Sequence, residues 1–316
     1  MSAPEPAKDE CLDLVLIGHI VKEMIYFPDR TLGPVLGSPA AYGAVAAGRL
    51  GESVGIVSVI GTDMPDGLLE PFRRAGVDMR GLLVKDGRCT TASELVYSRS
   101  GSKEIRYPQK APPIRFEDVP AEYYGAKIFY VATMDRDVPL MTIRRLSSLG
   151  GSLAIDLGGY GGAHSREHPS EAEQKRPVAL RQLIGYVDIV RASVEDCVHL
   201  LGADAVATEA AEEAVVRRFL DWGATIALLT SGERGCIVGT HKGIARIPAR
   251  QGEVIDTTGA GDTFSTAFLV EYMRTHDVRW SAQFGATTVI EIIERTGGVR
   301  AERMPTREEV KDRLAT

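Results

Sequence analysis

Short apolar segments recur along this chain and alternate with stretches that have the periodicity of a helix. Residues 12–18 form a short apolar run ending in Gly18, which is typical of a strand buried in a parallel sheet. Similar runs lie at residues 54–60, 126–131, 152–155, 188–190 and 225–229. Helical patterns lie at residues 39–50, 65–75, 138–149, 193–201 and 209–222. This alternation predicts an α/β fold, in which helices cover both faces of a parallel sheet.

Two segments interrupt the alternation, residues 20–36 and residues 87–113. They contain stretches rich in β-forming residues, such as residues 91–97 and 104–107, separated by Gly and Pro. They lie just after the first predicted strand and before the next strand–helix unit. We predict that they form a small inserted antiparallel β flap, and the alternative is a pair of loops.

Composition limits the classes of protein that this can be. The 316 residues suit one large α/β domain at residues 11–316, preceded by a polar tail rich in Pro and Ala at residues 1–10. The net charge of −6 argues against a nucleic-acid partner, and no apolar run reaches the ~20 residues that a membrane helix needs. The four cysteines are scattered, which favours reduced thiols. We therefore expect a cytoplasmic protein that acts on a small molecule.

The candidate chemistry lies in residues 254–264, Val-Ile-Asp-Thr-Thr-Gly-Ala-Gly-Asp-Thr-Phe. An apolar pair ends a predicted strand, and a turn of Gly259, Ala260 and Gly261 leads into a predicted helix. Small residues let the backbone N–H groups of the helix N-terminus approach an anion. Asp262 follows in the first turn, and phosphoryl transfer needs such a base beside donors for the charge on the transferred group. An ordinary helix cap is the alternative, and the length of the motif argues against it.

The whole segment resembles the signature of the ribokinase-like (PfkB) carbohydrate kinases. Residues 37–51 resemble the first motif of that family and residues 230–235 resemble its nucleotide-binding turn. Residues 284–298 occupy the place of the helix and loop that flank the adenine. The resemblance implies a parallel αβα sandwich whose small β flap closes over the substrate. It implies an anion hole at Gly259, Ala260 and Gly261, a catalytic base at Asp262, and nucleotide contacts at Thr230, Gly232, Gly235 and Ala286.

The chain departs from the family pattern on the acceptor side. Glu23 stands where the family usually has an Asp that binds substrate hydroxyls, and Asp29 is a rival carboxylate in the same segment. Gly37-Ser38 replaces a double Gly, and Tyr42 replaces an Asn. These differences make Glu23, Gly37, Ser38 and Tyr42 the acceptor-site candidates and leave the identity of the acceptor open.

The predicted support for a metal ion also differs from the family pattern. An Asn-x-x-Glu motif that supports the water shell of Mg²⁺ aligns here with Ser193-Val194-Glu195-Asp196. Asp196 can still bond a metal-bound water and Ser193 keeps one hydroxyl group, so both are outer-shell candidates. The alternative is that Ser193 caps the helix containing Asp196, which is compatible with that role.

The resemblance thus predicts an ATP-dependent phosphotransferase that uses Mg²⁺ and phosphorylates a hydroxyl of a small neutral polyhydroxylated acceptor. The expected acceptor is a sugar or a cyclic polyol such as inositol. A monovalent cation, K⁺, is a further candidate ligand, and the pairing of flaps in relatives implies a homodimer. Arg99, Lys103 and Arg106 are expected to be solvated flap charges, unless the acceptor is anionic.

Two other functions stay open. One is a nucleoside kinase, in which Tyr42 stacks on the base. The other is a catalytically inactive protein of the same fold that binds a sugar or a nucleotide. The retained Asp262 argues against the inactive protein, because a pure binder gains nothing from a base beside an anion hole.

Overall fold

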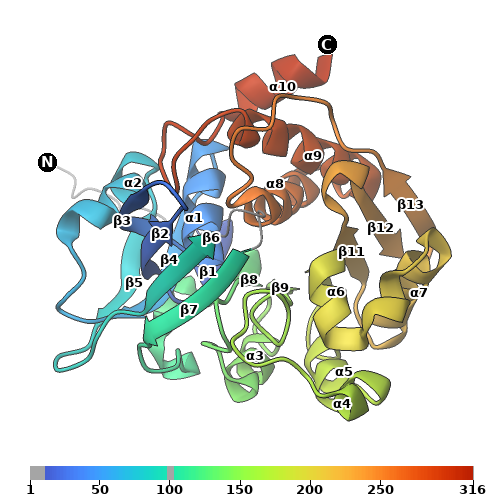
Figure 1. Ribbon diagram of the computed structural model, residues 1–316, viewed down its shortest axis with the longest axis horizontal. Helices are drawn as coiled ribbons and strands as arrows, with labels where there is room; N and C mark the ends of the chain where they lie inside the picture. Colours follow the sequence, from blue (N-terminus) through green and yellow to red (C-terminus); the bar gives the residue numbers. More distant parts are fainter. Residues whose placement is uncertain (1–10, 98–102, 316) are drawn as a thin grey trace, which may run out of the picture.

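The computed structural model describes residues 11–97 and 103–315. Within those residues the large sheet has the strand order β13-β12-β11-β10-β9-β8-β1-β4-β5 (Figure 1). The strands from β11 to β5 run parallel, and β12 and β13 add an antiparallel edge. The strands are β1 (Leu14–Ile17), β4 (Val54–Ile60), β5 (Asp78–Val84), β8 (Ile128–Val131), β9 (Ser152–Asp156), β10 (Ile189–Ser193), β11 (Ile226–Thr230), β12 (Cys236–Thr240) and β13 (Gly243–Ile247).

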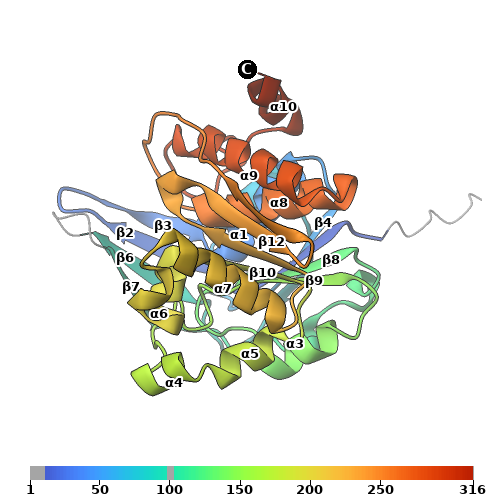
Figure 2. The same cartoon turned by 90° about the vertical axis from the view of Figure 1, so that its right-hand side faces the viewer.

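Helices cover both faces of this sheet (Figure 2). One face carries α1 (Pro39–Arg49), α2 (Glu70–Arg74), α8 (Ala260–Thr275), α9 (Val278–Ile293) and α10 (Arg307–Ala315). The other carries α3 (Leu140–Leu146), α5 (Val178–Ile184), α6 (Val194–Leu201) and α7 (Glu209–Asp221), with α4 (Glu171–Lys175) next to α6. The predicted sandwich of a mostly parallel sheet between two helical layers is confirmed.

The alternation of side chains along each strand creates the two cores. Leu14 and Leu16 of β1 pack into the core that includes Phe268 of α8. Val15 and Ile17 of the same strand pack into the core that includes Phe219 of α7. Successive side chains of a strand point to opposite faces, so a strand covered on both sides must be apolar throughout. That requirement explains why the central strands stand out in the sequence.

The two interrupting segments form a separate small sheet with the strand order β3-β2-β6-β7. Its strands are β2 (Val21–Tyr26), β3 (Thr31–Gly37), β6 (Ala92–Tyr97) and β7 (Lys103–Gln109). The flap is confirmed, but its prediction as purely antiparallel is wrong, because β2 and β6 pair in parallel. Both segments leave the large sheet after parallel strands, β1 and β5, so their first strands run in the same direction.

Several local predictions are corrected by the structure. The pair Val254-Ile255 does not end a strand, since β13 stops at Ile247, and the two residues are 64% and 51% exposed. The helix predicted at residues 65–75 is a 3-10 turn, Asp66–Leu69, followed by the short α2. The strands β5, β12 and β13 were not predicted, because their side chains are only partly buried or their apolar runs are short. No helix in the described ranges is long and apolar enough to cross a bilayer.

Candidate active site

A cleft of about 270 Å³ opens where the parallel strands end and the flap begins. Its lining comes from the flap, the first turn of α8, the end of β10 and the loop after β9 that contains His164. In Figure 1 the flap strands β6 and β7 lie to the left of α8 and α6. The carboxyl ends of parallel strands meet at one edge, so residues distant in the sequence come together there.

The turn before α8 has the geometry of an anion site. Gly259 is the N-cap of α8 and has a φ of 78°, in the left-handed region that favours glycine. A Cβ atom at Gly259 would lie 2.4 Å from Cδ1 of Tyr42, so the close approach also requires glycine. The Ala260 amide donates to the Thr257 carbonyl at 3.1 Å and is therefore used within the turn. The amides of Gly259 and Gly261 are the candidates that remain for an anion.

Asp262 lies in the first turn of α8, is buried, and lines the cleft together with Gly259, Ala260 and Gly261. The structure therefore brings the predicted base and the predicted anion-binding turn into one cavity. Tyr42 and Glu23 line the same cavity from α1 and from the flap. An acceptor held by Glu23 would have its hydroxyl groups within the same enclosed space as Asp262.

Arg191 is a cleft residue that the sequence analysis missed. It lies on the buried strand β10, and its Nη1 donates to Asp156 Oδ2 at 2.8 Å. Its Nη2 donates to Thr230 Oγ1 at 2.6 Å. A Cβ atom at Gly261 would lie 2.6 Å from the same Nη2, so the guanidinium packs directly on the anion-binding turn. A charged residue within an otherwise apolar strand was the available signal.

Arg191 stays positively charged despite its burial. Burial alone would lower the pKa of Arg191, but the carboxylates of Asp156 and Asp196 raise it. The Nη1 atom is 2.8 Å from Asp156 and 3.9 Å from Asp196, both of which are buried. The Nε atom has no hydrogen-bond partner among the described residues. A fixed positive charge therefore faces the cleft beside the anion-binding turn.

Asp196 and Ser193 form the start of α6. Ser193 Oγ accepts from the Asp196 amide at 3.0 Å, and its own amide and hydroxyl donate to Asp196 Oδ2, each at 2.7 Å. Asp196 Oδ1 accepts from the Ala163 amide at 2.8 Å. Burial alone would raise the pKa of Asp196, but Arg191, His164 and the bonds from Ser193 lower it. Ser193 is thus a helix cap, and Asp196 is an ionised carboxylate on the wall of the cleft.

On the acceptor side the structure separates the two rival carboxylates. Glu23 is buried on β2, lines the cleft, and accepts from Ser93 Oγ at 3.0 Å. Asp29 lies exposed in the connection between β2 and β3, where it pairs with Arg30 at 3.3 Å. A Cβ atom at Gly37 would lie 3.0 Å from the Glu23 carboxyl group, which explains the glycine there.

Ser38 and Tyr42 form the rest of the acceptor side. Ser38 caps α1 with a φ of 118°, a strained value for a residue with a side chain, and lines the cleft. The Tyr42 ring is both part of the core and part of the cleft wall. Burial and the charge of Glu23 raise the pKa of Tyr42, so its hydroxyl stays protonated. That hydroxyl has no hydrogen-bond partner within the described ranges.

The residues predicted to hold the nucleotide are not among the described residues that line this cleft. Thr230 ends β11 and bonds Arg191, whereas Gly232 and Gly235 form the turn between β11 and β12. A Cβ atom at Gly235 would lie 2.1 Å from the Ile247 carbonyl, so this glycine permits the close approach of β13. Ala286 lies on α9 and packs against the core. Gly232, Gly235 and Ala286 are not among the described residues that line the cleft.

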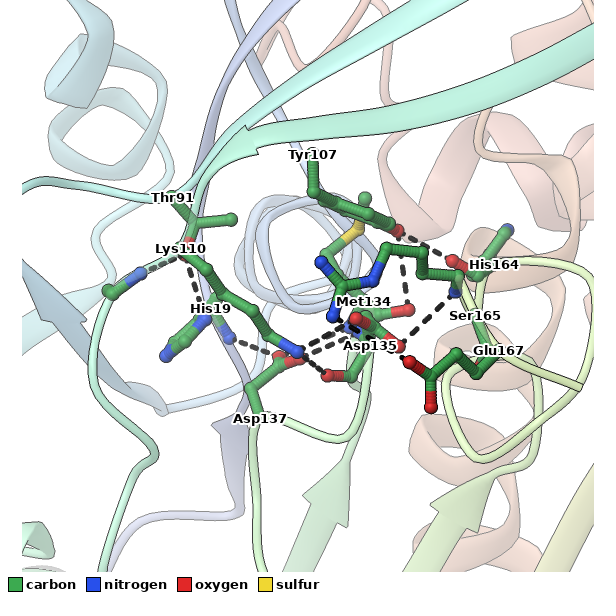
Figure 3. A network of polar contacts seen from close by, with 12 residues as sticks. His19, Thr91, Tyr107, Lys110, Met134, Asp135, Asp137, His164, Ser165 and Glu167 are labelled. Atoms are coloured by element: carbon green, nitrogen blue, oxygen red, sulfur yellow. Dashed lines mark hydrogen bonds and ion pairs between the residues drawn. The ribbon is translucent and has the colours of Figure 1, made fainter.

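A polar network attaches the flap to the body of the protein (Figure 3). Tyr107 of β7 donates to the His164 carbonyl at 2.6 Å, and Lys110 pairs with Asp135 at 2.8 Å. On the other side of the network, a hydrogen bond of 2.9 Å joins Thr91 Oγ1 and His19 Nδ1. These bonds join both ends of the second flap segment to loops that follow β1, β8 and β9, so they hold the flap over the cleft.

The structure describes only some of the charged flap residues that were singled out in the sequence. Arg106 pairs with Glu104 at 2.8 Å on the solvent-exposed surface. Lys103 begins β7, and Arg99 lies outside the described residues. The assignment of Arg106 to a solvated surface pair therefore agrees with the expectation from the sequence.

Comparisons with known proteins place this geometry in context. The model of a family described as "pfkB family carbohydrate kinase" matches residues 39–305. The cytidine kinase of Thermococcus kodakarensis is 29% identical over 90% of this chain and 98% of its own length. The structure is similar to that of the Xylella fastidiosa fructokinase with bound ATP, with a TM-score of 0.78 and 23% identity over 96% of this chain and 98% of that one. The Arabidopsis thaliana ribokinase complexed with ribose and ATP gives a TM-score of 0.79 and 18% identity over 97% of this chain and 100% of that one. The fold is therefore ribokinase-like.

Proposed function

The chain belongs to the pfkB family of carbohydrate kinases, and we propose that it transfers the γ-phosphoryl group of ATP to a hydroxyl of a small neutral acceptor. The observation that carries this proposal is the meeting of Asp262, the Gly259 turn and the Arg191 guanidinium in one enclosed cleft. A base, a set of N–H donors and a fixed cation are the groups that phosphoryl transfer requires.

The proposed reaction assigns one task to each of these groups. The acceptor hydroxyl oxygen bonds to the γ-phosphorus as the bond from that phosphorus to the β,γ-bridging oxygen breaks, and ADP leaves. Asp262 takes the hydroxyl proton, a contribution of roughly 10²–10⁴ in rate for general bases. The amides of Gly259 and Gly261 and the guanidinium of Arg191 stabilise the charge on the transferred group. The flap excludes water, which would otherwise compete with the acceptor.

Magnesium fits this proposal only as an ion carried by the nucleotide. No group of three or more His, Cys, Asp or Glu side chains in the described ranges has the arrangement of a metal site. Mg²⁺ keeps several waters and binds mainly through phosphates, where it neutralises charge. Asp196 is the carboxylate on the cleft wall that would accept from a metal-bound water, with Ser193 fixing its orientation.

For the nucleotide base we propose the exposed apolar pair that precedes the anion-binding turn. Val254 and Ile255 present apolar surface to solvent, and the Ile255 amide bonds the Ile293 carbonyl at the end of α9. Thr230 and Gly232 would form the opposite side of the nucleotide site, next to Arg191. Ala286 and Gly235 then act through the packing of α9 and β13 against this region.

The acceptor site suits a compound with neighbouring hydroxyl groups. Glu23 presents a buried carboxylate, which bonds hydroxyls and repels phosphate in a water-poor cavity. We therefore propose a sugar or a cyclic polyol as acceptor, with its hydroxyl groups bound by Glu23 and Ser38. Tyr42 adds a donor at the base of the cleft.

A nucleoside is the second candidate acceptor. The flap lines the cleft with Leu95, Ile105 and Tyr97, and the loop after β8 adds Met134. This apolar surface is more than a small sugar needs, and a planar base would cover it. The similarity to the Thermococcus kodakarensis cytidine kinase adds support.

A phosphate-acceptor screen tests these proposals. The full chain is incubated with ATP and MgCl₂ and with ribose, inositol, cytidine or fructose 6-phosphate, and ADP release and the phosphorylated product are measured. Turnover with ribose or inositol supports the first acceptor class, and a preference for cytidine supports the second. A preference for the sugar phosphate would overturn the neutral acceptor. ATP binding without turnover on a wider panel of the same classes would favour the inactive binder.

We also propose a homodimer through the flap. β3 is one of the two edge strands of the small sheet, and its Leu32 is 43% exposed, so this edge can pair with a second copy. Size-exclusion chromatography with light scattering of the wild type and of Leu32→Arg tests it. A monomeric wild type would contradict it.

A further inference from the structure

The loop that leads into the anion-binding turn is held by one buried arginine. Residues 256–258 belong to no strand or helix, and Thr258 directly precedes Gly259. Five backbone carbonyls surround the Arg303 guanidinium, those of Ile292, Arg295, Thr258, Gly298 and Asp256, at 2.8–3.3 Å. The Asp256 carboxylate completes the set, with Oδ2 at 3.6 Å from Nη2. All three nitrogens of Arg303 are therefore occupied.

Arg303 is enclosed as completely as a core residue, with 2% of its surface exposed. Its counter-charge, Asp256, accepts from the amides of Thr258 at 2.9 Å and Gly297 at 3.2 Å. Burial alone would raise the pKa of Asp256, but the bonds from Thr258, the charge of Arg303 and the bond from Gly297 lower it. The site is thus a buried guanidinium that pairs with the partly exposed carboxylate of Asp256 and is surrounded by carbonyl oxygens.

Carbonyl oxygens that converge with one carboxylate are the donor set of a site for a dehydrated monovalent cation. K⁺ is bound in proteins by rings of backbone carbonyls that replace its water shell. Here the same kind of oxygen cage contains the guanidinium of Arg303. Its N–H groups lie in the plane of the guanidinium and donate to different carbonyls of the cage. A monovalent cation does not fit beside it, because the guanidinium already occupies the centre of the cage and carries the same charge. The K⁺ that the family resemblance implies therefore does not match these residues.

We propose that Arg303 is a built-in cation that takes the place of a bound monovalent ion and fixes the loop before the anion-binding turn. Through the carbonyls of Asp256 and Thr258 it sets the position of Gly259, and through those of Ile292 and Arg295 it joins this loop to the end of α9. Arg303 is buried and is not among the described residues that line the cleft, so it is a positioning residue. The kinase consequently needs no K⁺.

The first test uses the wild-type chain and rests in part on the proposed kinase function. The rate with saturating ATP, Mg²⁺ and the best acceptor is measured in KCl, NaCl and choline chloride at one ionic strength. The melting temperature is measured in the same three salts, because a ligand that binds the folded state raises it. We expect rates within about twofold and equal melting temperatures. Activation by K⁺ of about tenfold or more, or a melting temperature raised specifically by K⁺, would overturn the proposal.

If no acceptor is phosphorylated, the proposed function fails while the melting temperatures still test the cation site.

The second test removes the guanidinium from the cage of carbonyl oxygens. Arg303→Ala is compared with Arg300→Ala, which removes an exposed arginine three residues away. We expect Arg303→Ala to be less stable in choline, and to regain stability and turnover number saturably with K⁺ or guanidinium, with little change in KM. Arg300→Ala should show neither effect.

A role limited to capping the end of α9 predicts a different result. Loss of stability without any rescue that is specific to K⁺ or guanidinium would assign Arg303 to that structural role and reject the built-in cation. If Arg303→Ala does not fold, Arg303→Gln replaces it, because its uncharged amide can still bond some of the carbonyls and does not repel a cation. Its activation by K⁺ supports the proposal, and behaviour equal to that of Arg300→Gln refutes it.

Discussion

Removal of the Arg191 guanidinium is the sharpest test of the cleft's electrostatics. Arg191→Met keeps a similar length and leaves Asp156 and Asp196 buried without their cation. Breaking a buried ion pair by removing one partner typically costs about 3–5 kcal/mol, because the remaining charge is uncompensated. Unfolding entropies of about 2.1 cal/mol/K per residue convert 4 kcal/mol into a decrease of roughly 6 °C in melting temperature for this chain.

The exposed Arg217 provides the matched control. It is 63% exposed and pairs with Glu213 at 3.8 Å on the surface of α7. Such pairs contribute about 0–1 kcal/mol, so Arg217→Met should lower the melting temperature by no more than about 1.5 °C. Both variants are measured by thermal unfolding and by steady-state kinetics with the best acceptor.

The pH dependence separates the charge of Arg191 from its packing. The pKa of Asp196 is lowered in the folded wild type, so its ionised form contributes stability above the unfolded-state pKa of about 3.9 and that contribution is lost as the pH falls further. In Arg191→Met burial is no longer opposed by the cation, and the pKa of Asp196 should rise. Acidification from pH 7 toward pH 4.5 should therefore narrow the stability difference between variant and wild type.

The kinetic arm completes this prediction. If Arg191 stabilises the transferred phosphoryl group, kcat of Arg191→Met should fall by roughly 10²–10³, the usual loss for one donor to a developing charge. Arg191→Lys keeps the charge and should recover part of this loss, without bonding Asp156 and Thr230 together. A stability difference that stays constant or grows on acidification, or a kcat equal to that of Arg217→Met, would refute the role given to Arg191.

The remaining predictions concern the base, the turn and the acceptor. Asp262→Asn should lower kcat by roughly 10²–10⁴ in the steady-state assay while ATP and acceptor affinities by calorimetry stay unchanged, and a kcat near the wild-type value would reject the base. Gly261→Ala should lower kcat more than it lowers the melting temperature, because its Cβ would lie 2.6 Å from the Arg191 guanidinium, which two hydrogen bonds hold in place. Loss of the folded state would instead show that this glycine is needed mainly for folding. Glu23→Gln should weaken acceptor binding by about 1–3 kcal/mol without changing ATP affinity, and an unchanged acceptor affinity would remove Glu23 from the site.

The parts of the fold that the sequence predicted are those with a buried environment on both sides. β4 has an apolar sequence throughout and was predicted at its observed bounds, Val54–Ile60. The hairpin of β12 and β13 was missed, because β13 is an edge strand whose residues are mostly half-exposed. Val254 and Ile255 led to the opposite error, a predicted strand end that does not exist. Their apolar side chains lie on an exposed surface and not in a strand.

The site divides in the same manner. The presence of Gly259 and Asp262 in one cleft could be expected from the sequence, because the proposed anion-binding turn and the proposed base are contiguous in the chain. Arg191 and Arg303 were not predicted, because their roles depend on partners such as Asp156 and Thr258, which are 35 and 45 residues away. A single charged residue in an apolar segment marks such a position, but its partners appear only when the sheet is assembled.

The two buried arginines would hold the proposed anion-binding turn in position before a substrate arrives. Arg303 holds Thr258 on one side of Gly259, and Arg191 packs against Gly261 on the other. Two hydrogen bonds hold the Arg191 guanidinium and five hold that of Arg303, so neither needs to reorient when the phosphoryl group moves. Charges that are fixed in advance stabilise a transition state without the reorganisation that water would require. Ion pairing with Asp156 and Asp256 offsets the desolvation of the two guanidinium groups. The position of the turn therefore depends on both ion pairs.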